Sequence, residues 1–146
     1  RLFRPSTTLT VWCWGLGARA GAQEALPNVD IVASLSDVEL RDLYLGHSFL
    51  LFPSSYEGFG LPPIEAMACG CIPVLYPEVG AAELYARDGV NSVYLNSDAE
   101  SVAGQIAGIL SDSETLRSMR LAGPASIEPF NPDGYGVRLL EAAGIL

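Results

Sequence analysis

The sequence contains no lysine, because all eight of its basic residues are arginines, and seventeen acidic residues bring the net charge to −9. Binding to nucleic acid needs a basic patch or stripe, so this charge balance argues against nucleic acid as a partner. Without an ammonium side chain, an anion must be held by arginine, by backbone N–H groups or by the end of a helix.

Histidine occurs once, as His47, and cysteine occurs three times. Cys69 and Cys71 are separated by one residue, which is not the spacing of zinc ligands, so we expect neither a metal site nor a disulfide framework. This cysteine usage favours a reduced, cytoplasmic setting. His47 follows Gly46 at a predicted helix end, where it is expected to contact the last carbonyl groups rather than to transfer protons in catalysis.

Long apolar runs are also lacking. No run approaches the roughly 20 residues that span a bilayer, and the N-terminus lacks the layout of a signal peptide. No membrane-spanning segment is therefore predicted, while peripheral contact with a membrane through the full-length protein stays open. The chain begins at Arg1 without an initiator methionine, which we interpret as a processed chain or, preferably, as a piece of a longer protein.

The sequence does contain segments with strand patterns that alternate with segments with helix patterns. Its 146 residues are a length typical of one domain. Strands separated by helices indicate right-handed crossovers, and so a Rossmann-like α/β fold: a parallel sheet with helices on both faces. The uninterrupted "SFLLF" predicts a strand buried on both faces. The predicted strands are 7–13, 29–32, 48–52, 72–76 and 92–95, and the predicted helices are 36–46, 62–69, 81–87, 97–110, 114–121 and 134–143.

Two of these helices have a start signal. Ser36 is followed three residues later by Glu39, which is the spacing of a capping box, where each residue satisfies an N–H group at the helix start. Ser97 and Glu100 have the same spacing. We therefore expect both serines to be N-caps.

The stretch "EGFGLPPIEAMACG" follows the predicted strand 48–52, where parallel sheets bind ligands at their carboxyl edge. Gly58 and Gly60 allow backbone conformations that other residues avoid. The N–H groups of residues 58–61 could then point at an anion, helped by the positive end of the helix that starts near Pro62. Pro62 costs little in a first turn and stiffens the loop.

Two glutamates flank this loop, Glu57 before it and Glu65 one turn into the helix. Carboxylates accept hydrogen bonds from hydroxyl groups, which are abundant in sugars and riboses. We expect both carboxylates to open onto the same cleft. An anion site between two carboxylates that accept hydrogen bonds from hydroxyl groups predicts a nucleotide-sugar site.

This stretch resembles the signature of the retaining GT-B glycosyltransferases of the GT4 family, in which G-F-G-L lies between two glutamates separated by seven residues. The flanking segments "LSDVELRDLY", "CIPVL" and "EVGAAELYARDGVNSVYL" are similar in order, and the resemblance covers about residues 29–110. It implies that residues 1–146 form the C-terminal, donor-binding domain, one half of a GT-B architecture. The N-terminal acceptor domain and the first strand–helix unit would then lie outside this chain, in cis or in trans.

The resemblance also implies roles for individual residues, in a hexosyl transfer with retention that needs neither metal nor cofactor. Glu57 would be catalytic and would bind the donor-sugar hydroxyls, and Glu65 would bind the ribose. Leu35 and Asp37 would lie near the nucleotide base. The donor's diphosphate and sugar would be held by backbone groups of Gly58, Phe59, Gly60 and Leu61.

Other interpretations stay open. The family's phosphate-clamping arginine and lysine lie upstream of this chain, unless Arg1 or Arg4 replaces them. The chain could thus be a nucleotide-sugar-binding module without turnover, or part of a related GT-B hydrolase, phosphorylase or epimerase. Phe59 could simply anchor the loop to the core, and the glutamates could be surface carboxylates. A dinucleotide enzyme is disfavoured, because no G-x-G-x-x-G follows the first strand.

Overall fold

The computed structural model describes residues 10–13, 30–78, 80–95 and 98–131 of the chain. They divide between two compact units, residues 1–42 and residues 43–146. Each unit is described below by itself. Among the described residues, no helix has both the length and the apolar character needed to cross a membrane.

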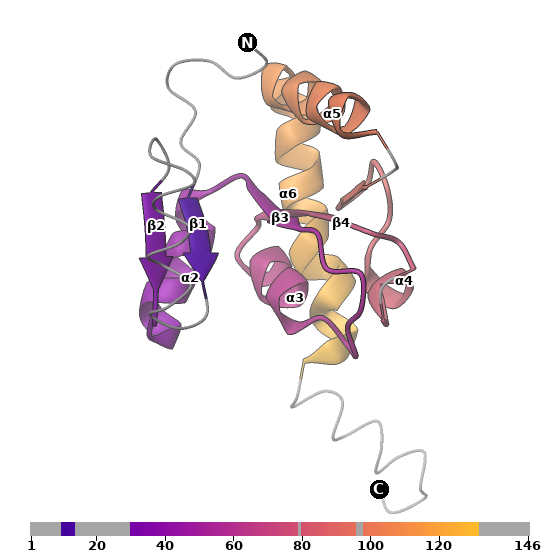
Figure 1. Ribbon diagram of the computed structural model, residues 1–146. Coiled ribbons are helices and arrows are strands. Elements are labelled where there is room, and N and C mark those ends of the chain that lie inside the picture. The colour runs from indigo at the N-terminus through magenta and orange to yellow at the C-terminus, as the bar shows by residue number, and fades with distance from the viewer. Residues whose placement is uncertain (1–9, 14–29, 79, 96–97, 132–146) are drawn as a thin grey trace, which may run out of the picture. The chain divides into compact units, whose positions relative to one another are not determined.

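The first unit contains a pair of strands (Figure 1). β1 (Thr10–Cys13) and β2 (Asp30–Ala33) pair in parallel, with Thr10 opposite Asp30. Helix α2 (Asp37–Gly46) starts in this unit, and its residues from Leu43 onward belong to the second unit.

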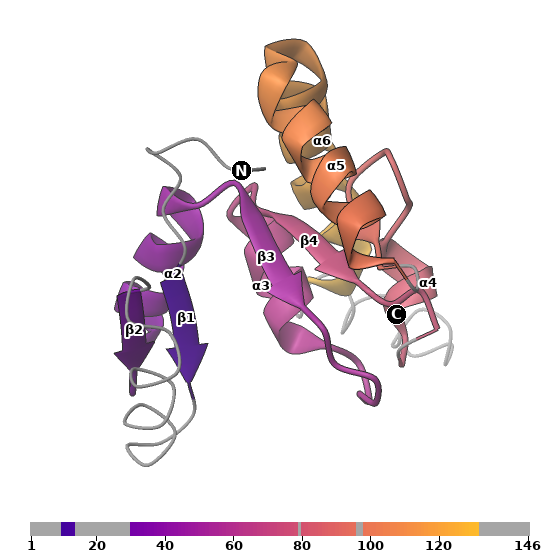
Figure 2. The ribbon, with the colours of Figure 1, turned by 45° about the horizontal axis from the view of Figure 1, so that its top comes forward.

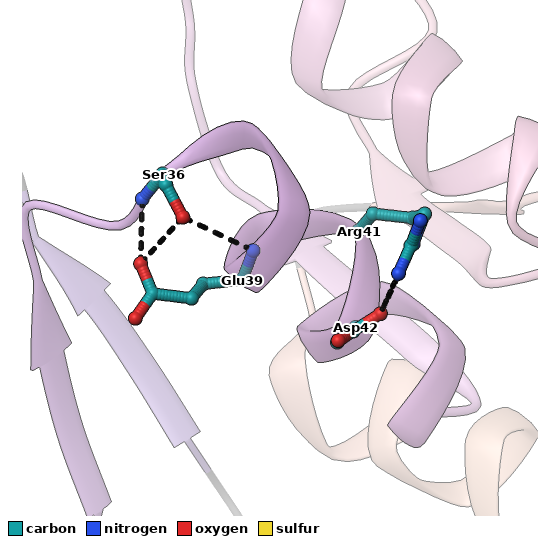
Figure 3. Close-up of polar contacts among 4 residues, drawn as sticks. All are labelled: Ser36, Glu39, Arg41 and Asp42. Atoms are coloured by element: carbon teal, nitrogen blue, oxygen red, sulfur yellow. Dashed lines mark hydrogen bonds and ion pairs between the residues drawn. The ribbon is translucent and has the colours of Figure 1, made fainter.

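The start of α2 confirms the first predicted capping box (Figure 3). The backbone N–H and the hydroxyl of Ser36 donate to Oε2 of Glu39 at 2.8 and 2.6 Å, and the Glu39 N–H donates back to the serine hydroxyl at 3.4 Å. These hydrogen bonds lower the pKa of the Glu39 carboxyl. The neighbouring Arg41–Asp42 ion pair is exposed, so it adds little stability.

The second unit is built on a parallel sheet in the order β3–β4–β5, which confirms the predicted α/β class. Figure 2 shows β3 beside β4. Its strands are β3 (Phe49–Phe52), β4 (Ile72–Leu75) and β5 (Val93–Tyr94). Its helices are α3 (Leu61–Ala68), α4 (Ala82–Tyr85), α5 (Ala99–Ser111), α6 (Ser113–Ile127) and the 3₁₀ helix η1 (Glu128–Phe130).

The core has two clusters, one on each face of this sheet, as the prediction of helices on both faces requires. β4 contributes to both clusters, because successive strand residues point to opposite faces. The first cluster joins Met67, Leu75, Ala82, Tyr85 and Ala86, and the second joins Ile72, Val74, Val93, Val102 and Met119. Helices α3 and α6 pack side by side (Figure 1), so closely that a Cβ at Gly123 would lie 3.1 Å from the Met67 carbonyl oxygen.

The prediction that residues 48–52 are buried on both faces is wrong. Leu51 is 56% exposed, whereas every residue of β4 is buried. The physical reason is position, because β3 lies at the edge of the described sheet and β4 lies in its centre. An apolar run alone does not distinguish these two positions.

Two helix boundaries also differ from the expectation. The N-cap of α5 is Asp98, whose carboxylate accepts from the N–H groups of Glu100 and Ser101, so the Ser97 prediction is wrong. Helix α6 continues past Pro124 to Ile127 instead of ending near residue 121, because tertiary packing compensates for the lost N–H. Ser97 and the predicted helix 134–143 lie outside the described residues.

A buried asparagine joins α4 to α6. Asn91 is 1% exposed, and its amide donates to the Tyr85 carbonyl at 2.9 Å and to the Ser126 hydroxyl at 2.7 Å. Its amide oxygen accepts from the Arg87 N–H at 2.7 Å. Its neighbour Ser92 is also buried, but the Ser92 hydroxyl has no hydrogen-bond partner in the described part of the chain.

These two neighbours are predicted to respond oppositely to truncation. Asn91→Ala would lower the free energy of unfolding by roughly 3 kcal/mol, because it leaves buried backbone groups unsatisfied. Ser92→Ala would leave it unchanged or raise it by up to about 1 kcal/mol, because it removes a buried hydroxyl without a partner. Urea denaturation of both variants checks this, and equal losses would contradict the assigned hydrogen bonding.

Candidate functional site

The candidate site is the loop of residues 53–60, which joins the carboxyl end of β3 to the N-terminus of α3. Gly60 is the N-cap of α3 with φ 81° and ψ 63°, a left-handed conformation that glycine adopts without strain. A proline occupies the first turn of α3, where its missing N–H leaves no helical hydrogen bond unmade. The loop is therefore locally stiff where it enters the helix.

Three successive carbonyl groups of this loop are held by α4 and its N-cap. The Tyr85 hydroxyl lies 3.2 Å from the Phe59 carbonyl oxygen and 3.4 Å from that of Gly60, within hydrogen-bond reach of both. The Ala81 N–H donates to the Gly58 carbonyl oxygen at 3.2 Å. All three peptide planes are thus oriented from the same side.

The N–H groups of these three peptides face the other way, because a trans peptide directs its N–H opposite to its C=O. They belong to Phe59, Gly60 and Leu61, and we call them the N–H ridge. Within residues 30–78, 80–95 and 98–131, no protein acceptor takes a hydrogen bond from the N–H ridge. Next to the positive end of α3, such donors are suited to an anion.

The aromatic ring of Phe59 packs on the core, as the interpretation of Phe59 as an anchor expects. It makes edge contacts with Tyr85 and Phe130, with ring centroids 6.1 and 5.5 Å apart. Tyr85 and Phe130 also contact each other at 6.2 Å. Phe59 therefore presents its backbone at the N–H ridge while its side chain fixes the loop to the core.

Glu57 precedes the N–H ridge and is half-buried. Its Oε1 accepts a hydrogen bond from the Ser54 hydroxyl at 3.1 Å, which orients the carboxylate. The Tyr85 hydroxyl is close enough to respond to this charge. Burial first, and the negative charge of Glu57 second, raise the pKa of Tyr85 to about 12.

Glu65 is an exposed residue of α3. Its Oε2 accepts a long hydrogen bond of 3.5 Å from the Tyr44 hydroxyl. Burial and the Glu65 charge together raise the pKa of Tyr44. Both glutamates thus have an orienting hydroxyl neighbour, while their opening onto one cleft stays a prediction.

The two predicted base contacts belong to the first unit. Leu35 is half-buried, and Asp37 is the exposed first residue of α2. Ser34 just before them has φ 56°, an uncommon value for a residue with a side chain. Their contact with a nucleotide base stays a prediction. His47 confirms its predicted structural role, because its Nδ1 lies 2.8 Å from the Leu43 carbonyl oxygen.

Sequence reasoning missed the residues that hold the loop from the other side. Tyr85 has no local pattern that predicts its contact with residues far away in the sequence. Gly80 has a contact with the loop that its sequence neighbours do not predict. Its φ is 57°, and a Cβ there would lie 2.5 Å from the Glu57 carbonyl oxygen and also clash with that of Gly58.

Gly80→Ala is therefore predicted to disturb the loop. It would lower the free energy of unfolding by roughly 3 kcal/mol, from backbone strain plus the clash with the Glu57 and Gly58 carbonyls. Gly89→Ala is the matched control, because Gly89 has a similar φ of 69° and nothing within 4 Å of a Cβ. It would cost about 1 kcal/mol. Thermal melting compares them, and equal losses would contradict the close approach of Gly80 to the loop.

The comparison with known families agrees with this geometry. Residues 16–125 match the family model described as glycosyl transferases group 1. This match identifies a glycosyltransferase domain, and the chain belongs to the glycosyl transferases group 1 family.

Two relatives illustrate the extent of the similarity. The chain is 34% identical over 118 residues to a D-inositol 3-phosphate glycosyltransferase of Segniliparus rotundus, covering 80% of this chain and 26% of the relative. It is 32% identical over 111 residues to a GDP-mannose:cellobiosyl-diphosphopolyprenol alpha-mannosyltransferase of Komagataeibacter xylinus, covering 73% and 28%. The chain thus spans about a quarter of the length of these relatives.

Solved structures confirm the fold, which is that of the C-terminal domains of GT-B glycosyltransferases. HepE of Anabaena in complex with UDP has a TM-score of 0.79 and 18% identity, over 98% of this chain and 42% of HepE. The C-terminal domain of the group 1 family protein LpcC from Francisella tularensis has a TM-score of 0.63 and 20% identity, over 77% and 61%. At these identities the likeness shows the fold alone.

Proposed function

We propose that the chain is the donor-binding part of a retaining glycosyltransferase of the GT4 type, which transfers a sugar from a nucleoside diphosphate to an acceptor. The observation that carries the proposal is the N–H ridge, a row of backbone donors at the start of α3 without a protein acceptor in the described residues. Because the chain has no lysine, arginine side chains and backbone donors such as these are the groups with which it can hold a diphosphate.

Each part of the site has a task in this function. The N–H ridge binds the diphosphate and stabilises the negative charge that develops on it as the sugar leaves. Gly58 extends this backbone surface toward Glu57, which binds the donor-sugar hydroxyls at the reacting centre. Glu65 accepts hydrogen bonds from the ribose, and Leu35 and Asp37 lie near the base. No metal or cofactor is assigned to this reaction.

The acceptor site belongs to the rest of the protein. Because the chain spans about a quarter of its relatives, we assign acceptor recognition to a further domain in cis or in trans. The complex of HepE with UDP supports a nucleotide donor. We place the reaction in the cytoplasm, in keeping with the cysteine usage of the chain.

The first test is calorimetric titration of the protein with UDP, GDP, ADP and their glucose or mannose conjugates. One nucleotide is expected to bind preferentially, and Glu65→Gln is expected to weaken it about tenfold, because the ribose loses a charged hydrogen-bond acceptor. Glu100→Gln is the matched control, because Glu100 is also an exposed helical glutamate but lies in the first turn of α5.

The outcomes separate the alternatives. The assigned donor site would be overturned if no nucleotide bound. It would also be overturned if Glu65→Gln and Glu100→Gln changed the affinity equally. Where binding occurs, product analysis with water, phosphate or an acceptor alcohol distinguishes transfer from hydrolysis and phosphorolysis. A donor that stays unchanged in all three, with the acceptor domain absent and also with it supplied, would identify a binding module instead of an enzyme.

A further inference from the structure

We propose that Tyr85 is a positioning residue, whose hydroxyl turns the N–H ridge toward the donor diphosphate without contacting the donor itself. This inference rests on the proposed function and deepens it. It assigns the geometry of the binding loop to a side chain on another helix, outside the glycine-rich stretch.

The first step is the hydrogen bonding of the hydroxyl. Its single proton is shared between the carbonyl oxygens of Phe59 and Gly60, at 3.2 and 3.4 Å. These carbonyls belong to the peptides whose N–H groups are those of Gly60 and Leu61. Holding the two oxygens therefore fixes the direction of two of the three donors in the N–H ridge.

The second step is the rigidity of Tyr85 itself. Its side chain is 2% exposed, it belongs to the first core cluster, and it contacts the rings of Phe59 and Phe130. Its backbone carbonyl accepts from the buried amide of Asn91, which is bonded in turn to Ser126 of α6. Apart from its ring contact with Phe59 of the loop, Tyr85 is thus held by residues outside the loop.

The third step is the fit between the hydroxyl and Gly60. A Cβ at Gly60 would lie 2.7 Å from the Tyr85 oxygen, so the loop backbone passes too close for any side chain. The Gly60 carbonyl loses its side-chain donor once the hydroxyl is removed. The backbone dihedral angles of glycine are little restricted. Without the Tyr85 hydroxyl, the peptide of the Gly60 carbonyl can therefore rotate so that its carbonyl points outward and its N–H points inward.

The protonation state of the Tyr85 hydroxyl is consistent with this role. Burial and the Glu57 carboxylate raise the pKa of Tyr85 to about 12, so the phenol keeps the proton that it donates at neutral pH. An ionised phenol would repel both carbonyl oxygens. Burial contributes more to this raised pKa than the Glu57 carboxylate does, and the neutral phenol stays a hydrogen-bond donor.

The test compares Tyr85→Phe with Tyr94→Phe. Both remove one phenol hydroxyl that donates to a backbone carbonyl, since the Tyr94 hydroxyl donates to Ala86 at 2.9 Å. In the full protein, Tyr85→Phe is expected to weaken binding of the preferred nucleoside diphosphate about tenfold, and Tyr94→Phe less than about twofold. Amide hydrogen exchange of Phe59, Gly60 and Leu61 is expected to change only in Tyr85→Phe.

The exchange measurement separates this inference from the proposed function. If the unmodified protein binds no nucleotide, the proposed function fails and with it the role toward a diphosphate, whatever the exchange rates. If the unmodified protein binds nucleotide but Tyr85→Phe binds equally well with unchanged loop amides, the positioning role is overturned and the donor site stands. Equal losses in Tyr85→Phe and Tyr94→Phe would overturn it too, because the effect would then be general destabilisation.

A second variant keeps the test decisive if Tyr85→Phe fails to fold. Gly60→Ala places a Cβ against the hydroxyl, and Gly70→Ala is its control, because Gly70 has φ 70° and its nearest contact would be an ordinary 3.5 Å. Only Gly60→Ala is expected to change the exchange of the loop amides and to weaken nucleotide binding. Equal effects of the two would contradict the fit between Gly60 and Tyr85.

Discussion

The candidate site depends on one constraint: the carbonyl groups of Gly58, Phe59 and Gly60 are all held from the side of α4. A peptide has two polar ends, so satisfying one end within the protein leaves the other for a ligand. The glycines allow the loop backbone to bend, but they do not determine the direction in which its carbonyl groups point. The direction comes from an amide and a phenol that the core holds in place.

Much of this arrangement could be predicted from the sequence, because local chemistry encodes it. The capping box of Ser36 and Glu39 depends on residues three apart, and the structure contains it. The helix after the loop follows from its prolines, and the end of α2 follows from Gly46 and His47. The alternation of strands and helices predicted the parallel sheet for the same reason, because each crossover connects elements that are neighbours in the sequence.

The errors at β3, α6 and Tyr85 have a common cause, which is that burial and packing are set by partners distant in sequence, whereas the N-cap of α5 differs from the expectation by only one residue. The apolar run of β3 resembles that of β4, yet only β4 has a described strand on each side. Helix α6 continues past Pro124 because Ser126 bonds to Asn91 and Ile127 packs against the first core cluster beyond the proline. Tyr85 carries no motif at all, since its partners Phe59 and Gly60 lie in another segment.

The contact between Phe59 and Phe130 has a consequence for the order in which the site forms during synthesis. A ribosome releases the loop well before it releases Tyr85, and Phe130 later still. A nascent chain that ends before residue 85 has no phenol to orient the loop carbonyls, and one that ends before residue 130 lacks one wall of the ring cluster. The site is thus completed only after the segment that carries its sequence signature has been synthesised.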